Sequence, residues 1–184
     1  MGAPVRTTRE RWIEQGLKML AAGGPDAVRV EPMASELGVT KGGFYGQFAD
    51  RQELLEAMLD AWEKEAVDDA TRGLRVPASD ATEAKANIER AGWATFPPGY
   101  LRDVELAIRD WARRDPDVRK RLRRVDSQRL DFLKSQFALL HSDPREVEAR
   151  SLLAFCLGLS HDQLTAPVRG KRELLDIALR VITD

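Results

Sequence analysis

The sequence VEPMASELGVTKGGFYGQF, residues 30–48, decides the local fold. Two short helices that cross closely need a small residue at the crossing and a left-handed turn residue four positions later. Ala34 and Gly38 meet these two requirements. Three apolar residues follow that can be buried behind the second helix: Val39, Phe44 and Phe48. The spacing predicts a helix over 32–37, a turn, and a second helix over 41–47.

This arrangement is typical of a helix-turn-helix, whose second helix lies in the major groove of DNA. An ordinary helical hairpin would show the same spacing, so the flanking residues decide between the two. Thr40 and Lys41 open the second helix, where free N–H groups attract a phosphate. Arg51 falls in the first turn of the next helix, where a cation is unfavourable unless an anion lies nearby. These flanks favour DNA binding.

Glycines are unusually frequent in the second helix: Gly42, Gly43 and Gly46. Each costs about 1 kcal/mol of helix stability relative to alanine, and close backbone approach to DNA is one reason to keep them. Tyr45 and Gln47 offer polar groups one turn further on. We therefore expect DNA contacts from Thr40, Lys41, Gly42, Gly43, Tyr45, Gln47 and Arg51.

The rest of the chain has the periodicity of an all-α protein. Its prolines separate stretches with apolar residues three and four apart, and alternating strand-like stretches are rare. Capping residues mark several helix starts: Thr7 with Glu10, Asp50 with Glu53, Asp115 before Pro116, and Asp143 before Pro144. About nine helices are predicted, over 7–23, 32–37, 41–47, 51–73, 79–92, 99–114, 116–140, 144–163 and 171–182. We expect a DNA-binding domain at 1–50 and a second helical domain at 51–184.

Charge and composition narrow the classes of function. The 184 residues carry 29 basic and 30 acidic side chains, so DNA contacts must come from a local patch. The single Cys156 cannot form an internal disulfide and has apolar sequence neighbours, which favours a packing role in a reducing, cytoplasmic setting. Long apolar runs and a signal-peptide core are missing, so we expect no membrane segment. We also expect no metal site, no cofactor and no enzymatic activity, because no catalytic motif is recognisable.

Residues 6–62 resemble the DNA-binding domain of the TetR family of bacterial transcriptional regulators. The family core Gly-Val-Thr/Ser-Lys-Gly-x-Phe/Leu-Tyr is kept at residues 38–45, with Phe48 and Arg51 beyond it. The chain departs from the family pattern at Gly43, Gly46 and Gln47, and residues 75–184 match only in their expected helical plan. The resemblance implies a homodimer on a near-palindromic operator, with recognition helices roughly 34–36 Å apart. It also implies repression relieved by a small molecule bound in the C-terminal domain.

The last two predicted helices are apolar on more than one face, so they need cover on two sides. A partner's matching helices would give a four-helix bundle between subunits; burial inside one subunit is the alternative. We assign the dimer interface to six positions: Leu152, Phe155, Leu159, Leu174, Ala178 and Val181.

A pocket for a hydrophobic inducer is predicted where aromatic residues concentrate. The candidates are five aromatic and two polar residues: Trp93, Phe96, Tyr100, Trp111, Phe132, Arg109 and Gln128. Plain core packing is the alternative for the aromatic ones.

Segment 109–134 holds ten basic and five acidic residues, against seven and six in 1–51. A second possible function is therefore a helical sensor or interaction protein whose basic segment binds RNA, anionic lipid or an acidic partner. The alternative is that long arginine side chains cover the solvent face of two helices.

Overall fold

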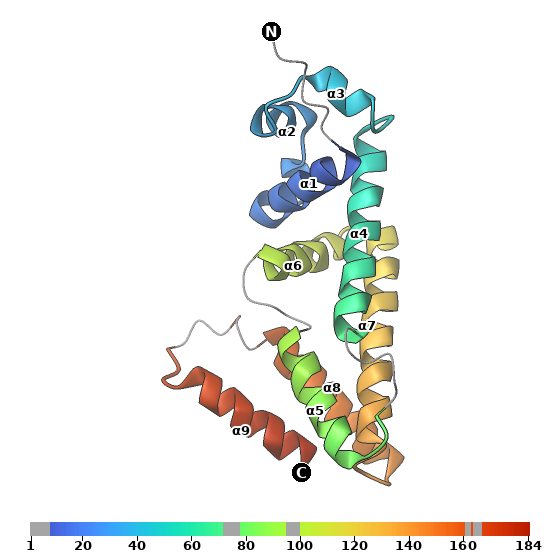
Figure 1. The fold of residues 1–184 in the computed structure, drawn as a ribbon, viewed down its shortest axis with the longest axis vertical. Helices are drawn as coiled ribbons and strands as arrows, with labels where there is room; N and C mark the ends of the chain where they lie inside the picture. Colours follow the sequence, from blue (N-terminus) through green and yellow to red (C-terminus); the bar gives the residue numbers. More distant parts are fainter. Residues whose placement is uncertain (1–7, 72–77, 95–99, 161–162, 164–166) are drawn as a thin grey trace. The chain divides into compact units, whose positions relative to one another are not determined.

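The computed structural model describes residues 8–71, 78–94, 100–160, 163 and 167–184. Within these ranges the chain forms nine α-helices and a short 3-10 helix, and no strand; the α-helices are labelled in Figure 1. Their bounds are α1 (Arg9–Gly23), η1 (Pro25–Ala27), α2 (Val30–Glu36), α3 (Lys41–Tyr45), α4 (Arg51–Thr71), α5 (Ala81–Ala94), α6 (Tyr100–Ala112), α7 (Pro116–Phe137), α8 (Pro144–Ser160) and α9 (Lys171–Thr183). The all-α prediction is confirmed.

The chain packs as two compact units, and the division into domains 1–50 and 51–184 stays a prediction. Unit 1 comprises Met1–Glu65 and Pro98–Arg123, and unit 2 comprises Ala66–Pro97 and Arg124–Asp184. The long helices α4 and α7 contribute residues to both units, and α6 packs against α1 within unit 1. Each unit is described separately below.

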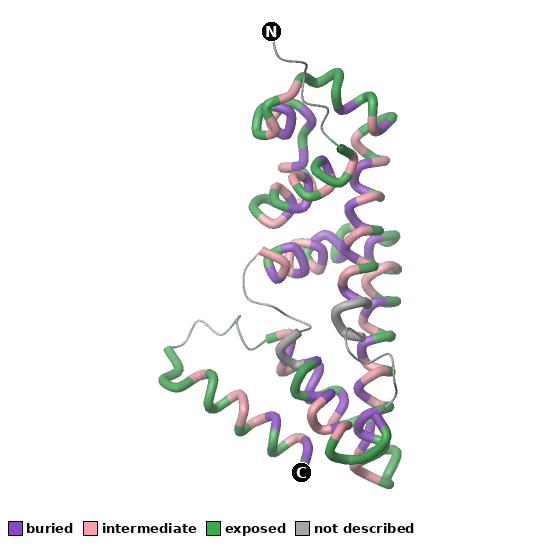
Figure 2. Tube along the Cα trace, in the orientation of Figure 1, coloured by how far each residue is buried: buried purple, intermediate pink, exposed green. Residues whose placement is uncertain are grey.

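Unit 1 is built on an aromatic cluster beneath α3. Trp12 in α1 packs edge-on against Phe44 in α3, with ring centroids 5.4 Å apart, and Phe44 stacks on Phe48 at 5.3 Å. All three side chains are buried. α1 also lies close to α4, since a Cβ at Gly16 would stand 2.6 Å from Sδ of Met58. Figure 2 shows stretches of buried residues along α1 and α4.

Acidic caps start the later helices as the sequence predicts. Asp50 Oδ1 accepts the N–H of Glu53 at 2.9 Å, and Asp143 Oδ1 accepts the N–H of Arg145 at 3.0 Å. Asp115 Oδ1 accepts two N–H groups at the start of α7. These caps satisfy N–H groups that have no partner within the helix.

Several predicted helix ends are displaced by a few residues, three of them in the helix-turn-helix and the helix before it. α1 starts after Thr8, whose side chain makes no capping bond, and Thr7 lies outside the described residues. α2 starts at Val30 because Pro32 fits within a first turn, where its missing N–H is not needed. α3 ends at Tyr45, two residues earlier than predicted.

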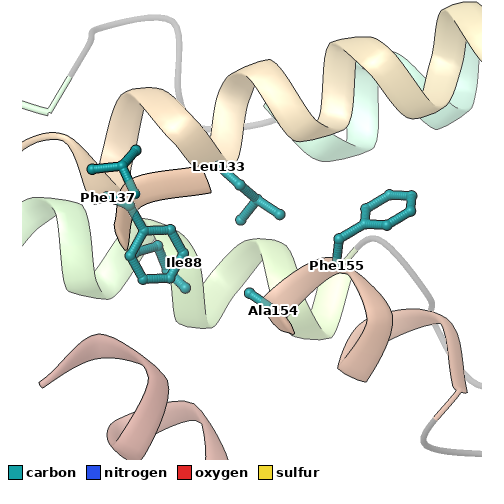
Figure 3. Packing of buried hydrophobic residues seen from close by; sticks show 6 residues of the cluster. Ile88, Leu133, Phe137, Ala154 and Phe155 are labelled. Carbon is teal, nitrogen blue, oxygen red and sulfur yellow. The ribbon is translucent and has the colours of Figure 1, made fainter. Parts of the chain in front are cut away.

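Unit 2 has its own apolar core between α5, α7 and α8. Figure 3 shows Ile88 of α5, Leu133 and Phe137 of α7, and Ala154 and Phe155 of α8 around it. A buried amide pair lies between the same helices, where Asn87 Nδ2 donates to Oε1 of Gln136 at 2.9 Å. Within the described residues, no helix is both long and apolar enough to cross a membrane.

Candidate nucleic-acid interface

The turn between α2 and α3 has the geometry that its spacing predicts. Gly38 adopts a φ of +66°, which only glycine adopts readily. The N–H of Gly38 donates to the carbonyl of Ser35 at 3.1 Å, and the N–H of Val39 donates to the carbonyl of Ala34 at 2.9 Å. Ala34 is buried at the crossing, and Val39 is half-buried. The segment is therefore a helix-turn-helix.

The outer face of α3 is exposed. Lys41, Gly42 and Gly43 are accessible to solvent, as is Thr40 just before the helix, and the Tyr45 side chain is 54% exposed. Phe44 and Phe48 pack into the core on the opposite side. The exposed side of α3 is therefore accessible to a molecule that binds unit 1. The seven predicted DNA contacts therefore separate into exposed α3 residues and two others, Gln47 and Arg51, described below.

Lys41 is held by an acidic residue of α2. Its Nζ donates to Oε1 of Glu31 at 2.5 Å, and both side chains are more than half exposed. The hydrogen bond lowers the pKa of Glu31 and raises the pKa of Lys41. Both groups stay charged near neutral pH, and a phosphate would compete with Glu31 for the Lys41 ammonium.

The glycines in α3 and directly after it serve no visible need of the fold. None of Gly42, Gly43 and Gly46 has a positive φ. A Cβ built on Gly43 would meet nothing within 4 Å, and one on Gly42 or Gly46 would meet only ordinary contacts beyond 3.5 Å. Alanine fits all three positions of the free protein.

Arg51 has partners inside unit 1. Its Nε donates to the carbonyl of Val28 at 2.6 Å, and one terminal nitrogen donates to the carbonyl of Pro25. These carbonyl oxygens explain a cation in the first turn of α4, where the sequence suggested a phosphate. A direct DNA contact by Arg51 stays a prediction.

Gln47 lies in the turn after α3, not in the helix predicted to contain it. Its side chain is half-exposed, and its backbone carbonyl accepts a hydrogen bond from Arg9. Sequence reasoning missed Arg9, because nothing in the spacing of α1 indicates that its first residue reaches the end of α3.

The residues predicted to form an inducer pocket divide between the units. Tyr100, Arg109 and Trp111 belong to unit 1, whereas Gln128 and Phe132 belong to unit 2. Arg109 pairs with Glu105 at 2.8 Å, Trp111 is buried, and Phe132 packs against the unit 2 core. Gln128 is exposed. The side chains of Trp93 and Phe96 lie outside the described residues.

The basic segment 109–134 finds many of its partners within the chain. Arg121 pairs with Asp60 and Glu63 of α4, Arg114 pairs with Asp110, and Lys134 lies 3.9 Å from Glu148. These contacts support the interpretation that the segment covers helix surfaces. Within the described ranges, no three or more His, Cys, Asp or Glu side chains gather as a metal site would require.

The six predicted interface residues fall on two sides of α8 and α9. Leu152, Leu174 and Val181 are exposed apolar side chains, and Ala178 is half-buried. The other two lie toward the core of their own unit: Phe155 is buried in it, and Leu159 is partly buried and packs against it.

Cys156, expected to be a packing residue, is exposed. The apolar sequence of α8 runs round the helix, but only the side carrying Val147, Ser151 and Phe155 turns inward.

Comparisons with known proteins agree with this architecture. Residues 13–58 match the family model of bacterial regulatory proteins of the tetR family, and residues 81–184 match the model of the tetracyclin repressor-like C-terminal domain. Among curated proteins, no sequence matches the chain.

Solved structures share the fold. The transcriptional regulator SCO7518 from Streptomyces coelicolor A3(2) is 20% identical with a TM-score of 0.69, covering 98% of this chain and 100% of its own. A transcriptional regulator from Saccharomonospora viridis, solved in complex with choline, is 21% identical with a TM-score of 0.69, covering 95% and 92%. AibR, solved with isovaleryl coenzyme A and operator DNA, is 13% identical with a TM-score of 0.71, covering 95% and 97%.

An all-helical chain with an exposed helix-turn-helix and a separate helical C-terminal part defines a class of DNA-binding regulators. The chain belongs to the TetR family of bacterial regulatory proteins, since the two family models together match most of its length. Members of this family are transcriptional regulators.

Proposed function

We propose that the protein is a transcriptional repressor that binds a near-palindromic operator as a homodimer in the cytoplasm. The observation that carries this proposal is the outer face of α3, which is exposed and lined by Lys41, Gly42, Gly43 and Tyr45 above a buried aromatic support. A helix held in this way can enter the major groove without rearrangement of unit 1.

Direct DNA contacts are proposed for the exposed residues Thr40, Lys41 and Tyr45. Gln47, at the edge of the exposed surface of α3, is proposed as a further contact. Gln47 offers an amide, which can pair with an adenine edge or a phosphate. Lys41 would exchange Glu31 for a phosphate, which fits a cation that lies at the surface and is not buried. Arg51 contributes mainly by donating hydrogen bonds to the carbonyls of Pro25 and Val28, which hold the start of α4 in unit 1.

The homodimer is proposed on the apolar side of α8 and α9 that faces solvent in the single chain. Leu152 and Leu153 in α8, and Leu174, Ile177 and Val181 in α9, are all exposed. α8 and α9 contact each other within unit 2, so their exposed sides can form one surface. Exposed apolar side chains that gather on one surface mark protein interfaces.

A small-molecule inducer is proposed from the two relatives solved with such molecules, choline in one and isovaleryl coenzyme A in the other. The ligand of this chain is unidentified, and we expect it to be largely hydrophobic. A thermal-shift screen of hydrophobic acids, amines and acyl thioesters tests the proposal, because a ligand that binds only the folded protein raises its Tm.

Selection of bound DNA from a random pool, followed by salt titration, tests the central proposal. The expected result is an inverted repeat with half-sites about one helical turn apart and an affinity that falls steeply with salt. Recovery of no consensus sequence would refute it. Lys41→Gln should weaken binding to all sequences alike and lower the salt slope by about 0.9.

A further inference from the structure

Arg9, the first residue of α1, contacts the segment that joins α3 to α4. The carbon at the centre of its guanidinium group lies 4.1 Å from the centroid of the Phe48 ring. One terminal nitrogen donates to the backbone carbonyl of Gln47, and the other donates to Oε1 of Glu53 at 2.9 Å. Cation–π and charge-assisted contacts of this kind fix the orientation of a guanidinium group.

Glu53 completes the connection from the α4 side. Its Oε2 accepts the N–H of Ala49 at 2.7 Å, so the carboxylate holds the turn while it pairs with Arg9. The Ala49 N–H, and then the Arg9 hydrogen bond, lower the pKa of Glu53. Glu53 is therefore ionised at neutral pH, and residues 47–49 are held from both sides.

The support matters because α3 has only five residues. A helix of this length is not stable by its own hydrogen bonds. Its direction therefore depends on the residues that pack against it. Trp12, one turn after Arg9, packs edge-on against Phe44 in the middle of α3. Arg9 acts at the other end, next to Gln47.

We propose that Arg9 is a positioning residue for DNA recognition, which fixes the direction in which Gln47 and Tyr45 face the operator and does not itself contact DNA. This inference rests on the proposed operator binding. Two of the three guanidinium nitrogens already donate within the protein, and the plane covers Phe48. The sequence spacing alone would place Arg9 among ordinary surface cations of α1.

The first test uses the protein without DNA. Hydrogen exchange should be faster in Arg9→Gln at the amides of Gln47, Phe48 and Ala49, and unchanged at Leu54 in α4. The control is Lys18→Gln, which removes a cation of α1 that pairs with Glu14 at the surface. Wild-type exchange rates at residues 47–49 would overturn the proposed hold on the turn.

The second test uses the operator that the wild-type protein selects. Arg9→Gln should lower the ratio of operator to non-specific affinity by about tenfold, at an unchanged salt slope. Lys18→Gln should leave the ratio unchanged. A salt slope of binding reduced by about 0.9, at an unchanged ratio of operator to non-specific affinity, would identify Arg9 as a phosphate contact and overturn the proposal.

A third variant separates charge from geometry. Arg9→Lys keeps the charge but cannot donate to Gln47 and Glu53 in the same fork, so it should fall near Arg9→Gln in specificity. Wild-type specificity in Arg9→Lys would contradict the positioning role. If the wild-type protein selects no operator, the proposed function fails, while the exchange measurement still tests the contact of Arg9 with the turn.

Discussion

Trp62 in α4 and Glu105 in α6 are joined by a buried hydrogen bond, in which the indole N–H donates to Oε2 at 2.9 Å. The other oxygen of Glu105 pairs with Arg109, one turn later in α6, at 2.8 Å. Glu105 is only 4% exposed. This carboxylate therefore fixes α6 to the helix that leads directly out of the helix-turn-helix.

Glu105→Gln should destabilise unit 1 although it retains an acceptor for Trp62. We expect the free energy of unfolding to fall by about 2 kcal/mol, because the half-buried guanidinium of Arg109 loses its carboxylate partner. Trp62→Phe loses a hydrogen bond and some packing, and should cost about 2 kcal/mol. Urea denaturation followed by circular dichroism measures both losses. A Glu105→Gln protein as stable as the wild type would contradict the role of the charge.

Arg51→Gln should act on folding more than on DNA contacts. It removes the hydrogen bonds to the carbonyls of Val28 and Pro25, and we expect a loss of about 2 kcal/mol in the free energy of unfolding. The salt slope of operator binding, measured well below the Tm, should stay within error of the wild-type slope. A slope lowered by about 0.9 at full stability would instead identify Arg51 as a phosphate contact.

Gly43→Ala should have opposite effects on stability and on DNA binding. The new methyl group meets open space in the free protein, so the variant should gain up to about 1 kcal/mol of stability from helix propensity. We expect operator affinity to fall about tenfold if DNA approaches the α3 backbone closely. Gly16→Ala is the contrasting variant, since its methyl group would meet Sδ of Met58 at 2.6 Å and should lower the Tm. A stabilised Gly43→Ala protein with wild-type affinity would show that DNA does not require this glycine.

The sequence was sufficient to predict the helix-turn-helix because its requirements are local. Ala34, Gly38 and Phe44 have their roles within fifteen residues, and helix caps such as Asp50 and Asp143 act within three. The DNA-facing side follows from which side of α3 is buried. These features need no knowledge of distant contacts.

Roles that depend on distant partners could not be predicted in the same way. Arg9 reaches Gln47 across 38 positions, and Trp62 reaches Glu105 across 43. Arg109 is a polar residue near aromatic ones in the sequence, which suggested a pocket. Its pairing with Glu105 depends on how α6 packs and could not be predicted. The burial of Phe155 in the unit 2 core could not be predicted either, because a helix that is apolar all round does not reveal its inward face.

Tyr100 provides a prediction about alkaline pH. Burial, and then the charges of Glu14 and Glu65, raise the pKa of its phenol to about 12. Because the folded state holds the proton more tightly than the unfolded state, this contribution to stability is complete below pH 10 and is lost as pH rises toward 12. Absorbance at 295 nm after a rapid pH jump, in a Tyr45→Phe variant, should show half-ionisation near pH 12. A midpoint near 10 would mean that the phenol is open to solvent.

Val181→Lys tests the dimer surface on α8 and α9. Val181 is 69% exposed in the single chain, so lysine should leave the fold of the subunit intact. Within a dimer the same lysine would place a charge in an apolar contact, and we expect the dissociation constant to rise about a hundredfold. Sedimentation equilibrium measures this change. Leu139→Lys is the matched control, because Leu139 is exposed and apolar but lies outside α8 and α9.

Cys156 gives this test a second readout. It is the only cysteine of the chain, it is exposed, and it lies one turn from Leu152 on α8. A dimer that covers Leu152 should shield the thiol, so its reaction with a thiol reagent should be slow in the wild-type protein and in Leu139→Lys, and fast in Val181→Lys. A wild-type protein that sediments as a monomer at micromolar concentration, with a freely reacting Cys156, would exclude this surface as the dimer interface and leave the operator-binding homodimer without its proposed contact.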